Sequence, residues 1–248
     1  MRHYLQVTVP DEKELYIVGD IHGNARLWDL TKKEFGITDN DVVFSLGDIV
    51  DRGKNNSKLL FEFLFQDNRY MINGNHESML VDGLTNREWY HCHMSNGGDK
   101  LYEELGHTGV EFFAQYLKDL PMIIEIHYRG MKIGLVHGCC PLRYTDWNEF
   151  LTDSSTLSPK IVEECIWSRN DFDYAKQNNT YHSPRISNID YVISGHSPVF
   201  DPLIYGNRWW IDSQFSTGDL TVVQPNSGKL RYFRREKDAY SFDRKRGY

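Results

Sequence analysis

The sequence VVFSLGDIVDRG, which occupies residues 42–53, contains the features that decide the fold. Its first half is a largely apolar run, as expected for a strand that is buried on both faces. Its second half changes at once to charged side chains framed by glycine. The carboxyl ends of the strands in an α/β sheet face one crevice, where ligands bind. The stretch therefore predicts an α/β sheet with a polar site at its edge.

Four further apolar runs end in polar side chains in the same way. These runs are residues 15–19, 69–73, 131–136 and 190–194. The polar residues that follow the five runs include Asp20, His22, Asp48, Asn75, His76, His137 and His196. A single Asp-Gly or His-Gly at a strand end is ordinarily a turn. Turn formation explains the glycines, but it gives no reason for histidine to recur at matching places, so a shared metal site is the simplest common cause.

These side chains are suitable ligands for divalent metals. Imidazole and carboxylate bind Mn, Fe and Zn, and the amide oxygen of Asn75 adds another hard donor. Asp20 and His22 are two residues apart, so an extended backbone would direct both side chains toward one ion. Glycine next to nearly every candidate ligand permits tight turns and a close approach of the backbone.

The rest of the chain predicts a single α/β domain over residues 1–248. Helical spacing is found in residues 24–35, where Asn24 is a candidate cap, and in residues 56–65. Further strand-like segments are residues 122–127, 208–212, 219–224 and 229–233. The candidate site residues all fall within residues 15–224, and residues 231–248 form a basic tail.

Composition excludes several classes of protein. The 248 residues include 28 Lys and Arg against 35 Asp and Glu, a net charge of −7, which argues against nucleic-acid binding. The amino-terminal residues lack the apolar core of a signal peptide, and no run approaches the roughly 20 apolar residues needed to cross a bilayer. We therefore expect a cytoplasmic location without membrane attachment. The four cysteines have no regular spacing, so we expect free thiols.

The polar segments together resemble the calcineurin-like metallophosphoesterases. The matching segments are GDIHG at 19–23, GDIVDRG at 47–53, GNHE at 74–77, HG at 137–138 and GH at 195–196. The full GDIVDRG and GNHE forms are similar to the phosphoprotein phosphatase family. The connecting segments look most like the small bacterial and phage serine/threonine phosphatases of the lambda type, over residues 15–224.

The resemblance implies two stacked mixed β-sheets flanked by α-helices, and a site that holds two divalent ions. It assigns Asp20, His22 and Asp48 to one ion, and Asp48, Asn75, His137 and His196 to the other, so that Asp48 bridges. Manganese is the expected metal, with Fe, Zn and Mg as alternatives. A hydroxide that bridges the ions would attack the phosphate of phosphoserine or phosphothreonine in a protein, with phosphotyrosine left open.

The resemblance also assigns the remaining catalytic roles. His76, paired with Asp51, would be the general acid, and Arg52 and Arg169 would bind the phosphate. Two other functions stay open: a symmetrical dinucleoside polyphosphate hydrolase, and a non-catalytic phosphate-binding module. The sequence lacks the GFYxEC segment of larger eukaryotic catalytic subunits, so no regulatory subunit is expected. Residues 145–160, residues 171–188 and the adjacent Cys139 and Cys140 match nothing assignable, which leaves the natural substrate and the oligomeric state open.

Overall fold

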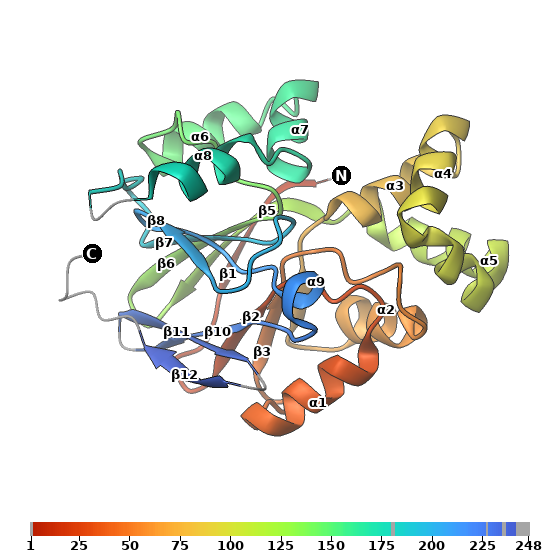
Figure 1. The fold of residues 1–248 in the computed structure, drawn as a ribbon, viewed down its shortest axis with the longest axis horizontal. Helices are drawn as coiled ribbons and strands as arrows, with labels where there is room; N and C mark the ends of the chain where they lie inside the picture. Colours follow the sequence, from red (N-terminus) through yellow and green to blue (C-terminus); the bar gives the residue numbers. More distant parts are fainter. Residues whose placement is uncertain (1, 180–181, 227, 235–236, 242–248) are drawn as a thin grey trace.

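Two six-stranded mixed β-sheets form the centre of the molecule (Figure 1). A computed structural model describes residues 2–179, 182–226, 228–234 and 237–241. The first sheet has the order β1 (Arg2–Thr8), β5 (Pro121–Tyr128), β6 (Met131–Val136), β7 (Tyr191–Ser194), β9 (Arg208–Trp210), β8 (Leu203–Tyr205). The second has the order β12 (Lys237–Ser241), β11 (Lys229–Arg234), β10 (Val222–Asn226), β2 (Leu15–Val18), β3 (Val42–Ser45), β4 (Arg69–Met71).

Helices cover the outer face of each sheet. Against the second sheet pack α1 (Ala25–Phe35), α2 (Asn56–Phe65), α3 (Asn75–Gly83) and α5 (Asp99–Leu117). Against the first sheet pack α6 (Trp147–Ser154) and α7 (Pro159–Ile166), and α8 (Asn170–Asn178) lies beside β8. The elements α4 (Arg87–His93), the π-helix Met94–Gly98 and the short α9 (Gln214–Thr217) complete the helical set of the described residues. The predicted architecture of two mixed sheets flanked by helices is confirmed.

Alternation along the strands divides the core into layers. In β2 and β3, Ile17 and Phe44 point into the layer between the sheets, whereas Tyr16 and Val43 pack against the outer helices. Both faces of these strands are thus buried, which explains why their sequences are continuously apolar. Full burial of one such side chain stabilises the fold by about 1.5–3 kcal/mol.

Several predicted elements agree with the structure, and others were missed. Asn24 caps α1, because its side-chain oxygen accepts a hydrogen bond from the Leu27 amide at 3.2 Å. The segments 145–160 and 171–188, for which the resemblance gave no assignment, contain α6 and parts of α7 and α8. Of the basic tail, residues 235–236 and 242–248 lie outside the described residues. Within the described part of the chain, no helix has both the length and the apolar character needed to cross a bilayer.

Candidate metal centre

Loops from both sheets converge on one cleft between them. From the second sheet come Asp20 and His22 after β2, Asp48 after β3, and Asn75 at the start of α3. From the first sheet come His137 after β6 and His196 after β7. These six candidate ligands are 6% exposed or less, and five of them together with His76 surround a cleft of about 510 Å³. The sixth, His137, is fully buried.

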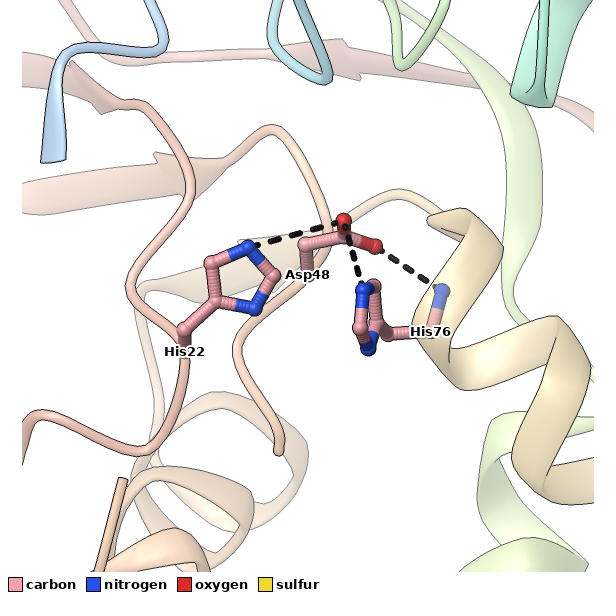
Figure 2. A group of neighbouring side chains, drawn as sticks. All are labelled: His22, Asp48 and His76. Carbon is pink, nitrogen blue, oxygen red and sulfur yellow. Dashed lines mark hydrogen bonds and ion pairs between the residues drawn. The ribbon is translucent and has the colours of Figure 1, made fainter. Parts of the chain in front are cut away.

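The first possible ion position lies between His22, Asp48 and His76 (Figure 2). The ring atoms His22 Nε2 and His76 Nε2 each lie 3.9 Å from Asp48 Oδ2. The backbone amide of His76 donates to the other Asp48 oxygen at 3.0 Å. Asp20 had been predicted here and lies nearby, with both of its oxygens accepting from the amide of His196 at 3.1 Å.

The second possible position lies between Asp48, His137 and His196, with Asn75 in contact with both histidines. Asn75 Oδ1 lies 3.0 Å from His137 Nε2 and 2.8 Å from His196 Nδ1. His137 Nε2 is also 3.4 Å from Asp48 Oδ1. Asp48 belongs to both groups, so its carboxylate is placed to join two ions.

Backbone carbonyls fix the orientation of each ligand histidine. The carbonyl of Val50 accepts from His22 Nδ1 at 3.1 Å, and that of Leu46 accepts from His137 Nδ1 at 2.6 Å. The carbonyl of Trp167 accepts from His196 Nε2 at 2.8 Å. In every case the opposite ring nitrogen lies toward Asp48 or Asn75. Metal-binding histidines characteristically donate their second N–H to such an acceptor.

The buried carboxylates indicate that the cleft is built for cations. Burial, followed by the charges of Asp212 and Asp48, raises the pKa of Asp20 well above its ordinary value. Burial and the charge of Asp48 likewise raise the pKa of Asp212 to about 6, and Asp212 Oδ1 has no hydrogen-bond partner among the described residues. Three buried carboxylates in one cleft repel one another unless positive charge lies between them. Divalent ions held by these residues would supply that charge.

The candidate ligand histidines differ in their protonation state. Burial lowers the pKa of His22 and of His196 to about 3, so both are neutral and ready to bind a cation. Burial would also lower the pKa of His137, but Asp48 overcomes this effect and raises it to about 10. Metal binding at His137 must therefore release a proton.

His76 and Asp51 form a buried pair at the edge of this centre. His76 Nδ1 donates to Asp51 Oδ2 at 2.6 Å, and Asp51 is fully buried. Burial by itself would lower the pKa of His76, but Asp48 and Asp51 together raise it. The arrangement favours a protonated imidazole, which is the form that a general acid needs.

Two arginines reach the same cleft. Arg52 Nη1 lies 2.9 Å from His22 Nε2, and Arg52 Nη2 lies 3.1 Å from His76 Nε2. Arg169 lines the cleft from the start of α8, where its guanidinium donates to the carbonyl of His196 at 3.0 Å. Both of the arginines predicted to bind phosphate thus lie beside the candidate ligands.

Unusual backbone conformations are concentrated at this centre. Five of its residues have φ between 47° and 72°, in the left-handed region, and none is glycine: His22, Asp48, Asp51, Arg52 and His196. Glycines make room for their side chains, because a Cβ on Gly74 would lie 2.2 Å from Asp48 Oδ1 and one on Gly195 would lie 2.2 Å from Asp20 Oδ1. Such strain persists only where the surroundings impose it, and it is typical of functional sites.

Two acidic residues of the centre were missed in the sequence. Asp212 lies two residues beyond β9, although residues 208–212 were predicted to be strand throughout. Because β9 runs parallel to β7, Asp212 occupies the same edge as His196. Glu77 accepts from the amides of Asp48 at 2.8 Å and Ile49 at 2.9 Å, and so fixes the loop that carries Asp48. Its position in the segment GNHE, next to the predicted site residues Asn75 and His76, could have identified it in the sequence.

A third missed residue, His93, contacts Asp51 from the opposite side to His76. His93 is fully buried, and its Nε2 lies 2.9 Å from both Asp51 oxygens. A Cβ on Gly98 would lie 2.5 Å from the His93 ring, so glycine at that position makes room for the imidazole. Burial would raise the pKa of Asp51, but hydrogen bonds from His76 and His93 lower it. Asp51 is therefore held as a carboxylate between two imidazoles.

Replacing His93 with Phe should slow hydrolysis of an alkyl phosphate by roughly 10- to 100-fold. Losses of this size are typical when a residue that hydrogen-bonds to a site residue is replaced. Asp51 would lose its only donor to Oδ1 among the described residues and would no longer orient His76. An aryl phosphate with a good leaving group should be affected far less, and His93→Gln, which keeps a donor, should recover part of the loss. Equal losses on both phosphates would show that His93 serves packing alone.

Comparison with known proteins identifies relatives of this chain. The family model described as calcineurin-like phosphoesterase matches residues 14–200. The serine/threonine-protein phosphatase 2 of Salmonella typhimurium is 28% identical over 222 residues, which cover 86% of this chain and 93% of the relative.

Solved structures share the fold at lower identity. A Saccharomyces cerevisiae protein serine/threonine phosphatase has a TM-score of 0.63 at 16% identity, and the match covers 96% of this chain and 84% of that one. A protein described as a diadenosine tetraphosphatase on a provisional basis has a TM-score of 0.55 at 18% identity, with 94% and 99% covered. A protein-tyrosine phosphatase from a Shewanella species has a TM-score of 0.58 at 15% identity, with 98% and 83% covered.

Proposed function

Because this chain belongs to the calcineurin-like phosphoesterase family, we propose that it is a protein phosphatase that hydrolyses phosphoserine and phosphothreonine. The observation that carries the proposal is the buried His76–Asp51 pair beside the two candidate ion positions. Serine and threonine alkoxides are poor leaving groups, and a placed general acid is what their departure requires. The Salmonella relative, named a serine/threonine-protein phosphatase, supports the same substrate class.

We assign the two ion positions to Asp20, His22 and Asp48 and to Asp48, Asn75, His137 and His196. Bound divalent ions would supply an acidified water as nucleophile and would neutralise phosphoryl oxygens. We propose manganese as the metal, because imidazole, carboxylate and amide donors all suit it. Arg52 and Arg169 would bind the phosphate, since a guanidinium matches two phosphate oxygens. His76 would then carry its proton on Nε2, the atom that lies 3.1 Å from Arg52 Nη2 in the structure.

The rival substrate is a dinucleoside polyphosphate, and one set of assays separates the two. We expect a phosphoserine peptide to be hydrolysed with a kcat/KM at least about tenfold above that for diadenosine tetraphosphate, a difference of about 1.4 kcal/mol in transition-state binding. An aryl phosphate and a phosphotyrosine peptide complete the set, each measured with Mn, Fe, Zn and Mg. A preference for diadenosine tetraphosphate would overturn the proposal, and failure on all four substrates would favour a binding module.

A further inference from the structure

A second cleft, of about 440 Å³, opens beside the catalytic one. The two clefts share His22 and Arg52. The second cleft lies where the loops that begin α1 and α2 meet, and Gln214 closes one side, held by its hydrogen bond to the carbonyl of Ile21. A molecule whose phosphate contacts Arg52 would therefore extend directly into this space.

The second cleft carries two positively charged side chains that have no charged partner within the described part of the chain. Arg26 and Lys54 line it and are exposed, and neither forms an ion pair or a side-chain hydrogen bond among the described residues. None of the described residues that line the cleft is Asp or Glu. Three cations, counting Arg52, are thus gathered in one place on a chain whose net charge is −7.

Two carboxylates that belong to or contact helices α1 and α2 are engaged elsewhere. Asp29 pairs with Lys58 and Lys32. Glu104 accepts from the first amides of α2, those of Asn56 at 2.7 Å and Ser57 at 2.9 Å, and so neutralises the amino end of that helix. The amino end of α1 has no carboxylate in its first turn, and its partial positive charge adds to that of Arg26.

We propose that this second cleft binds an acidic side chain next to the phosphorylated residue, so that the protein prefers phosphopeptides with Glu or Asp beside the phosphoserine. The inference rests on the proposed phosphatase function and specifies its substrate. A carboxylate in the cleft would form charge-assisted hydrogen bonds with Arg26 and Lys54 while Arg52 binds the phosphate. Because the two cations are exposed, added salt should weaken the preference.

The test compares Arg26→Ala/Lys54→Ala with Lys33→Ala/Lys118→Ala, a control that removes the same charge from exposed positions outside the cleft. The substrates are two phosphoserine peptides that differ only in having Glu or Gln beside the phosphoserine. The unaltered protein should favour the Glu peptide in kcat/KM. The cleft variant should lower this Glu-to-Gln ratio about tenfold, mainly through KM, a loss within the range for charged hydrogen bonds. The control should keep the ratio.

A binding measurement checks the same point without turnover. Fluorescence anisotropy with a labelled Glu peptide that carries a non-hydrolysable phosphonate should show a similar loss of affinity in the cleft variant. Equal losses in both double variants would overturn the inference, because net charge alone would then explain them. Peptide hydrolysis without any Glu preference would also overturn it, although the proposed function would stand. If only diadenosine tetraphosphate were hydrolysed, in a manner dependent on Arg26 and Lys54, both proposals would fail.

Discussion

Asp48→Asn should reduce metal binding and turnover together. Asp48 is the one carboxylate shared by both possible ion positions, and the neutral amide of Asn offers a single weaker oxygen donor. Loss of metal catalysis removes several kcal/mol of transition-state stabilisation, so kcat/KM should fall by at least about 10³-fold. Metal content, measured by plasma emission spectrometry after dialysis, should drop from two equivalents to one or none.

The matched control is Asp67→Asn, which removes an exposed carboxylate just after α2 and should keep both metal and activity. Asn tolerates the left-handed backbone at position 48, where φ is 50°, so the variant should fold, as circular dichroism can verify. An Asp48→Asn protein that retains two equivalents of metal would refute the bridging role.

His76→Asn should separate substrates by their leaving groups. Without a proton donor, hydrolysis of a phosphoserine peptide should slow by about 10²–10⁴-fold, the usual contribution of general acid catalysis. An aryl phosphate with a good leaving group departs without protonation and should lose much less. Steady-state kinetics on both substrates, with metal content measured alongside, provide the comparison.

Metal content matters here because His76 lies in the same group as His22 and Asp48. If the variant loses an ion, His76 is a metal ligand. If the variant keeps two ions and is slowed mainly on the phosphoserine peptide, His76 is the general acid. His91→Asn, on the exposed side of α4, is the control for loss of an imidazole. If both substrates are hydrolysed at the original rate, neither role holds.

The sequence was most informative where strands end. Apolar runs buried between two layers are continuous, so the points at which Asp20, Asp48 and His137 interrupt them are visible without coordinates. Strand β1 has no continuous apolar run, because it is an edge strand whose side chains are half-exposed or exposed. It was therefore not predicted. The helices α6 to α8 are only eight or nine residues long, which leaves too few turns for a clear periodic pattern.

Contacts between distant segments explain what was missed at the site. His93 reaches Asp51 across 42 positions in sequence, and only the packing of the helical segment 75–117 brings them together. Asp212 was not predicted as a site residue because residues 208–212 were assigned to a strand. In the structure β9 ends at Trp210, which places Asp212 in the loop that follows the strand. Positions of this kind depend on tertiary packing and cannot be obtained from local spacing.

The five left-handed residues at the centre each combine backbone strain with a side chain that the site uses. Each is held in a conformation that costs a non-glycine residue about 1 kcal/mol or more. At Arg52, an exposed position with φ of 62°, glycine would remove that cost at no loss of packing in the core. The same change would also remove the guanidinium that lies 2.9 Å from His22 Nε2 and 3.1 Å from His76 Nε2. Arginine at this position thus combines a strained backbone with a cation placed directly beside the two histidines.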